Sequence, residues 1–125
     1  MIKFKRFLPV VLLSTSMLIP SKAYAAHGRI VDNTWYRSIV GVWVEVYGGE
    51  SGWAHIKRQG DSQVADWKYE TYGHPYSLHI GVGGDEENWA QNVKTDIIED
   101  DRKHKYIEVR LIGSWFNQQY VAIVK

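Results

Sequence analysis

Cysteine is absent from the 125 residues, which excludes disulfide bonds and a thiol nucleophile. Motifs for metal or nucleophilic chemistry are absent as well. The histidines show neither H-x-H nor H-E-x-x-H spacing, and residues 49–53 (GESGW) lack the final glycine of a G-x-S-x-G elbow. We therefore expect a protein that is not an enzyme, with a small hydrolase as the less favoured alternative.

The first 25 residues have the three parts of a cleavable signal peptide. A positively charged start is followed by an almost uncharged apolar run over residues 7–20 and by an A-x-A site that ends at Ala25. As a helix, an apolar run of about 14 residues spans about 21 Å, short of the ~30 Å hydrocarbon core, which favours cleavage over a membrane anchor or a buried helix. We predict a signal peptide over residues 1–25, a single mature domain over residues 26–125, and secretion to the extracellular space.

Runs of basic residues are missing from the mature chain. Four of the 15 Lys and Arg residues, and none of the 14 Asp and Glu residues, precede residue 26, which leaves 11 basic against 14 acidic side chains and a formal charge of −3. Nucleic-acid binding needs clustered Lys and Arg to contact phosphates. We therefore expect no nucleic-acid partner and, since no second apolar run reaches membrane length, no membrane span in the mature form.

The mature sequence does contain an alternation of period two, interrupted by Gly, Asp and Asn clusters, which is typical of β-strands. In residues 39–47 the valines at even positions face one way, and the other face carries Ile39, Trp43, Glu45 and Tyr47. Helical periodicity is convincing nowhere. About seven short strands are expected, over residues 39–47, 53–58, 63–71, 76–82, 93–98, 105–112 and 115–124.

Strands at this spacing are typical of a small antiparallel β-sandwich or barrel, and the sequence does not choose between the two. Residues 26–33 are polar and are expected to be loose. Residues 83–92 are expected to form a long acidic loop, and Gly113-Ser114 a two-residue hairpin turn. The predicted fold class is all-β, with one domain that side-chain packing alone must stabilise.

Aromatic residues are plentiful, with six Trp, seven Tyr and one Phe after residue 25. Flat rings beside carboxylates suit stacking on the apolar faces of sugars, and the same ring types form hot spots in protein interfaces. The competing interpretation is that these rings form the second half of a core. The candidate ligand-binding residues are Trp43, Tyr47, Trp67, Tyr69 and Tyr72. With Trp53, at least three rings of this set are expected to be exposed and coplanar.

An acidic cluster follows the glycines at 83 and 84. Three carboxylates and no lysine make this segment unsuitable for phosphate. Asp85, Glu86 and Glu87 instead offer the hard oxygen ligands that Ca²⁺ prefers, to which Asn88 and residues 99–101 could add, although the spacing matches no EF-hand. A solvated acidic loop is the simpler interpretation, so we expect no cofactor, with calcium as the alternative.

Two histidines, His55 and His79, fall on the outer faces of expected strands and could pair with Asp66 or Glu70 if those strands are neighbours. Such a pair would carry the hydrolase hypothesis. Isolated surface histidines are the simpler interpretation, because catalysis needs a mutual geometry that spacing does not supply.

These observations predict a secreted, non-enzymatic binding module that recognises an extracellular or cell-surface glycan or protein through an aromatic patch. A secreted antimicrobial protein or an inhibitor of a foreign enzyme is the alternative. It would present a rigid, protruding loop at residues 72–76 or 83–89. The pattern predicts no oligomeric state.

Overall fold

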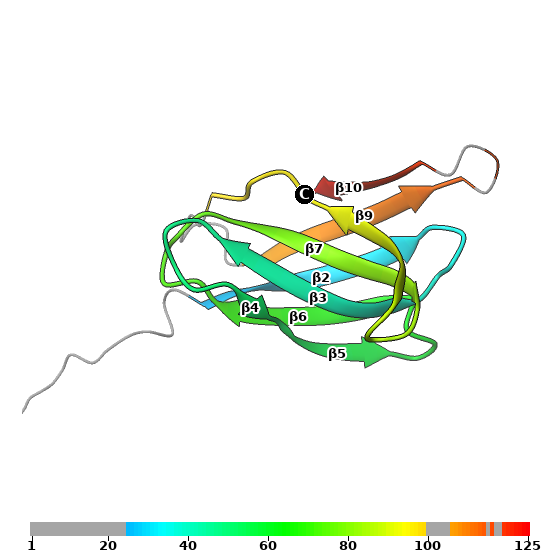
Figure 1. Ribbon diagram of the computed structural model, residues 1–125, viewed down its shortest axis with the longest axis horizontal. Coiled ribbons are helices and arrows are strands. Elements are labelled where there is room, and N and C mark those ends of the chain that lie inside the picture. Colours follow the sequence, from blue (N-terminus) through cyan, green and yellow to red (C-terminus); the bar gives the residue numbers. More distant parts are fainter. Residues whose placement is uncertain (1–24, 100–105, 115, 117–118) are drawn as a thin grey trace, which may run out of the picture.

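The structure is a computed structural model, and it describes residues 25–99, 106–114, 116 and 119–125. These residues form nine strands in two sheets packed face to face, which confirms the all-β prediction and makes the domain a sandwich rather than a barrel (Figure 1). No helix among them is long and apolar enough to cross a membrane. The predicted signal peptide lies outside the described residues except for Ala25, and it stays a prediction.

Five strands make up the first sheet. They span Ala25–Asn33 (β2), His55–Gln59 (β5), Val64–Glu70 (β6), Tyr106–Gly113 (β9) and Tyr120–Val124 (β10). Their order across the sheet is β10-β9-β2-β6-β5. Strands β2 and β9 run parallel, which departs from the antiparallel arrangement that the sequence predicts. The departure is possible because β9 arrives from the other sheet and not through a hairpin with β2.

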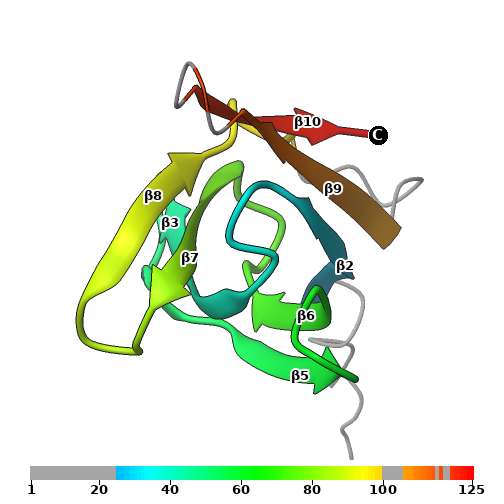
Figure 2. The same ribbon diagram turned by 90° about the vertical axis from the view of Figure 1, so that its right-hand side faces the viewer.

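Four strands make up the second sheet. They span Ile39–Val46 (β3), Gly52–Trp53 (β4), Tyr76–Gly84 (β7) and Trp89–Lys94 (β8). Their order is β4-β3-β7-β8, and all neighbours are antiparallel. The chain passes between the sheets after β2, β4, β6 and β8. Figure 2 shows the two sheets around the core, with β8 and β10 in contact at one side of the sandwich.

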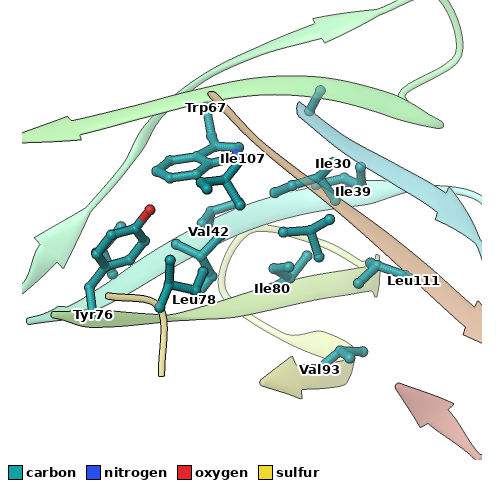
Figure 3. Packing of buried hydrophobic residues seen from close by; sticks show 14 of the residues in the cluster. Ile30, Ile39, Val42, Trp67, Tyr76, Leu78, Ile80, Val93, Ile107 and Leu111 are labelled. Carbon is teal, nitrogen blue, oxygen red and sulfur yellow. The ribbon is translucent and has the colours of Figure 1, made fainter. Parts of the chain in front are cut away.

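Alternate side chains of both sheets fill the space between them. Strand β7 contributes four buried hydrophobic side chains, as its alternation predicts: Tyr76, Leu78, Ile80 and Val82. The indole of Trp67 on β6 meets the ring of Tyr76 edge-on, with centroids 5.8 Å apart, while Ile30 and Leu111 enter the same core from β2 and β9 (Figure 3). Because no disulfide is available, this packing holds the sheets together.

The segment over residues 26–33, predicted to be loose, belongs to β2 at the centre of the five-stranded sheet. Its polar side chains at His27 and Arg29 alternate with Ile30 and other buried positions. Strand β9 passes so close to Gly28 that a Cβ there would lie 1.7 Å from the carbonyl oxygen of Ile107. The prediction was wrong because the exposed polar residues cover only one face of the strand. The other face is buried, with Ile30 in the core and Asp32 accepting the backbone N–H groups of Thr34 and Ser38.

The long acidic loop predicted over residues 83–92 is much shorter in the structure. Gly83 and Gly84 continue β7 with positive φ angles of 71° and 80°, and β8 already begins at Trp89. The connection is therefore residues 85–88. Glycine at these two positive-φ positions lets the strand twist sharply into the turn. Because the segment is rich in glycine and acidic residues, its composition alone indicated a loop.

Two further boundaries differ from the prediction. The strand expected over residues 93–98 ends at Lys94. Gly113 pairs with Tyr120, so β9 and β10 are joined by a longer connection than the two-residue turn expected at Gly113-Ser114. With β2 and the short β4, the described residues hold nine strands where seven were predicted.

Replacing Trp67 by alanine is expected to lower the free energy of unfolding by about 3–5 kcal/mol, because the indole is 2% exposed and its removal leaves a cavity between the sheets. Trp53, which is 61% exposed, serves as the matched control. Trp53→Ala should cost about 1 kcal/mol or less. Urea denaturation followed by far-UV circular dichroism measures both, and equal losses would contradict the assignment of Trp67 to the core.

Candidate functional site

Three indoles gather on the outer face of the four-stranded sheet. Trp43 comes from β3, Trp53 from β4 and Trp89 from the start of β8. The rings of Trp43 and Trp53 are 5.1 Å apart at 84°, and those of Trp53 and Trp89 are 5.8 Å apart at 77°. We call Trp43, Trp53 and Trp89 the tryptophan cluster. Both contacts are edge-to-face, the arrangement that aromatic quadrupoles favour.

Two glycines without side chains leave the space that the indole of Trp89 occupies. Gly41 on β3 and Gly81 on β7 are register partners in neighbouring strands. A Cβ added to Gly81 would lie 2.1 Å from Cδ2 of the indole, and one added to Gly41 would lie 3.0 Å from Cζ2. The ring of Trp89 therefore lies directly against the backbone of the sheet, in space that any other residue at 81 would occupy.

A β-bulge interrupts the start of β3. The pairing of β3 with β7 shifts between Ile39 and Gly41, so Ile39 joins Val42, Val44 and Val46 in the core, whereas Val40, expected inward, is only half-buried. The simple alternation of the sequence placed Ile39 on the outer face with Trp43, which is wrong. The bulge changes which residues of β3 share a face without disturbing Trp43, Glu45 and Tyr47 further along the strand.

Hydrogen-bonding side chains lie beside the tryptophan cluster on the same face. Nε2 of His79 is 2.8 Å from Oε1 of Glu45, and Nζ of Lys94 is 3.4 Å from the same oxygen. The hydroxyl of Tyr47 lies 3.0 Å from Oγ of Ser77. We call these five residues the polar network. His79 is the register partner of both Trp43 on β3 and Lys94 on β8, which brings the network against the cluster.

Charge is stabilised within the polar network. The hydrogen bond from His79 lowers the pKa of the Glu45 carboxyl, and the nearby Lys94 ammonium lowers it further. The negative charge of Glu45 in turn raises the pKa of Lys94. At neutral pH this face therefore presents a carboxylate and an ammonium, which accept and donate hydrogen bonds respectively.

The candidate site residues from the sequence are distributed over three environments. Trp43 and Tyr47 lie on the outer face as expected. Trp67 is buried between the sheets, and its assignment to an exposed patch is wrong because β6 turns that position inward. Tyr69 is half-buried, and its hydroxyl donates to the carbonyl of Glu50 at 2.8 Å, which ties β6 to the turn before β4.

Tyr72 stands apart from the other rings. It is 62% exposed in the turn after β6, with a φ of 53°. The expectation of at least three exposed, coplanar rings is also wrong: of the six rings only Trp53 and Tyr72 are exposed, and Trp53 meets Trp43 at 84°. One exposed indole, Trp53, with edge-to-face contacts to the half-buried Trp43 and Trp89, replaces the flat platform that the sequence predicted.

The sequence did not identify Trp89 and Lys94 as site residues. Trp89 was hidden because residues 83–92 were interpreted as a loop, and Lys94 because β8 was placed four residues too late. The glycine at 81, unusual in a strand of alternating apolar residues, was the available signal: it indicates close approach of another group to the backbone.

The acidic turn uses its first carboxylate for its own backbone. Oδ1 of Asp85 accepts the amide N–H groups of Glu87 at 2.9 Å and of Asn88 at 2.8 Å. Glu86 faces Arg58 at 3.9 Å. Among the described residues there is no group of three or more His, Asp or Glu side chains that could hold a metal ion. Asp100 and Asp101, two of the calcium candidates, lie outside the described residues.

The histidine–carboxylate pairs suggested by the sequence do not form. His79 pairs with Glu45, and His55 has Lys68 as its register partner. Asp66 is held by Arg29 at 3.0 Å. The structure therefore forms one histidine–carboxylate pair, His79 with Glu45, in place of the pairs that the sequence suggested.

Glu45→Gln is expected to change how stability depends on pH. Because folding lowers the pKa of Glu45, its stabilising effect is fully present above the ordinary glutamate pKa of about 4.3 and is lost as pH falls through the lowered value. The advantage of the wild-type chain over Glu45→Gln in urea midpoint should thus shrink between pH 7 and pH 3. Glu87→Gln, which removes an exposed carboxylate, is the control; the same pH trend there would refute the assignment.

Gly81→Ala is expected to displace Trp89, because the new methyl group would overlap the indole. The exciton-coupled circular dichroism of the neighbouring indoles should weaken, as it should in Trp89→Phe. The chain should stay folded, since the indole can move outward. An unchanged exciton signal in Gly81→Ala would show that Trp89 lies elsewhere.

No protein-family model and no curated protein matches the chain. Among solved structures it is similar to the fimbrial anchor protein Mfa2 from Porphyromonas gingivalis, with a TM-score of 0.48 and 13% sequence identity. The match covers 82% of this chain and 46% of that one, so this chain spans about half the length of that protein.

Proposed function

We propose that the chain is a non-enzymatic binding module that holds a carbohydrate against the outer face of its four-stranded sheet. The observation that supports this most is the side-by-side placement of the tryptophan cluster and the polar network on one sheet face. A sugar ring has apolar C–H faces and a rim of hydroxyl groups. The two halves of this face match those two features.

The tryptophan cluster offers aromatic surface in a fixed position. Trp53 exposes 61% of its surface and is held on two sides by the rings of Trp43 and Trp89. A side chain that is already held loses little conformational entropy when a ligand binds, so more of the contact energy appears as affinity. Tryptophan is also among the residues that most often dominate binding energy.

The polar network offers hydrogen-bonding groups beside the tryptophan cluster. Glu45 and Lys94 remain partly exposed, at 37% and 50% of their side-chain surface. A carboxylate accepts and an ammonium donates, while a sugar hydroxyl does both, so one hydroxyl can bridge the pair. Hydrogen bonds of this charged type distinguish one hydroxyl arrangement from another.

A binding role also agrees with the way the network is connected. Catalysis by a serine requires its Oγ within hydrogen-bond reach of a base. Here Oγ of Ser77 contacts Tyr47, and Nε2 of His79 is occupied by Glu45. The hydroxyl and the imidazole therefore serve separate partners, which supports recognition over nucleophilic chemistry.

Binding is tested by titrating the purified protein with a panel of soluble oligosaccharides while tryptophan fluorescence is recorded. For any oligosaccharide that binds, Trp53→Ala should weaken the affinity by about tenfold or more, the effect of losing about 1.4 kcal/mol or more at a hot spot. Phe116→Ala is the matched control, because that ring is 93% exposed and lies outside the cluster. The proposal fails if no oligosaccharide binds, or if both variants bind as the wild-type chain does.

A further inference from the structure

A row of basic side chains crosses the outer face of the five-stranded sheet. His55 on β5, Lys68 on β6 and His27 on β2 are successive register partners. They occupy outward positions: on β6 and β2 the alternate positions, Trp67 and Gly28 among them, are buried, while on β5 Ile56 is half-buried. We call these three residues the basic row.

The basic row lacks the partners that its neighbours have. One step along the strands, Arg29 pairs with Asp66 at 3.0 Å, and Asp66 also accepts from Gln59 at 2.8 Å. In contrast, the side chains of Lys68 and His55 make no hydrogen bond or ion pair with any described residue. The imidazole of His27 makes an edge contact with Tyr106, with centroids 6.0 Å apart. Lys68 thus presents a charged donor between two imidazoles, and the N–H groups of all three side chains can be donated to an anion.

The same three side chains line a surface hollow of about 590 Å³. Trp53 and Tyr69 form its aromatic wall, and Ala25 and Glu70 complete it. Glu70 is the carboxylate among the lining residues, and its Oε1 accepts the backbone N–H of Tyr72 at 3.2 Å. The hollow thus joins an exposed aromatic ring to unpaired N–H donors.

Trp53 connects this hollow to the proposed carbohydrate face. Its ring contacts Trp43 and Trp89 on the four-stranded sheet and also lines the hollow over the five-stranded sheet. The chain crosses from β4 to β5 at Ala54, immediately after Trp53. A sugar stacked on Trp53 would therefore have the basic row within its reach on the other side.

We propose that this hollow binds the anionic group of an acidic sugar, and that the protein selects acidic over neutral oligosaccharides. The inference rests on the proposed function, since it names the ligand class of that site. The shared chemistry is a carboxylate or sulfate on a sugar ring stacked against Trp53. Lys68 supplies a charged donor to it, and the imidazoles of His27 and His55 supply N–H groups from either side.

Three oligosaccharide probes distinguish charged from uncharged ligands and carboxylate from sulfate. They are oligogalacturonate, its fully methyl-esterified form, and a sulfated oligosaccharide. The esterified form has the same rings without the charge. The wild-type chain should bind oligogalacturonate or the sulfated probe about tenfold or more tightly than the ester, as expected for a charge-assisted hydrogen bond. The preference should shrink as salt is raised. Which acidic probe binds better distinguishes carboxylate from sulfate.

The basic row is tested by Lys68→Gln alone and by the triple variant His27→Gln, Lys68→Gln, His55→Gln. Both should lose the preference for the acidic probe while their affinity for the methyl ester is unchanged. Lys125→Gln removes the same charge at the β10 edge of the same sheet and should keep the preference. Unaltered urea midpoints establish that the variants, all at outward positions, remain folded.

Two negative outcomes are distinct. If the wild-type chain binds the ester and the acidic probes equally, or if the triple variant keeps the preference, the anionic subsite is refuted while carbohydrate binding stands. If neither these probes nor a broader oligosaccharide panel binds, the proposed function itself is refuted, and the inference with it.

Discussion

The pairing register of β3 with β7 is the constraint on which the rest of the site depends. It places Gly41 opposite Gly81, Trp43 opposite His79 and Glu45 opposite Ser77. A slip of one residue in either strand would move every outer side chain to the core face. The valines of β3 and the apolar residues of β7 prevent that slip, because they would then have to face water. Burial on one face therefore fixes the chemistry displayed on the other.

Trp53 lies where the chain passes from the four-stranded sheet to the five-stranded sheet. It occupies a two-residue strand that pairs with β3, and the chain then crosses directly into β5. One ring can for this reason contact the indoles of one sheet and line a hollow over the other. In a cysteine-free sandwich, the crossing is held by packing and by the hydrogen bond of Tyr69 to Glu50, and not by a covalent link.

The sequence predicted well wherever one strand carried a clear alternation. The inward face of β7 and the outward face of β3 from Trp43 to Tyr47 follow from the pattern alone. The same alternation placed Trp43 and Glu45 on one face, and both residues belong to the candidate site. These successes depend only on the two-residue period of an extended chain, a local property.

The failures share a non-local cause. Trp67 alternates as regularly as Trp43, but only the position of the second sheet decides which face of β6 is buried. The polar strand β2 is central in its sheet because β6 and β9 pair on either side of it. Since β9 lies far along the chain, the local sequence of β2 does not reveal this pairing. Trp89 joined the cluster through glycines at 41 and 81, forty residues apart in sequence. Such contacts follow from topology, which a single pattern of residues does not contain.

The most direct test of the account uses the indole N–H signals of the tryptophans in a two-dimensional ¹⁵N–¹H spectrum. When a binding oligosaccharide is added to the purified protein, the indole signals of Trp43, Trp53 and Trp89 should shift together, while that of Trp67 should stay in place. Shifts confined to indoles outside the cluster would contradict the account, and so would a binding oligosaccharide that moved none of these three signals.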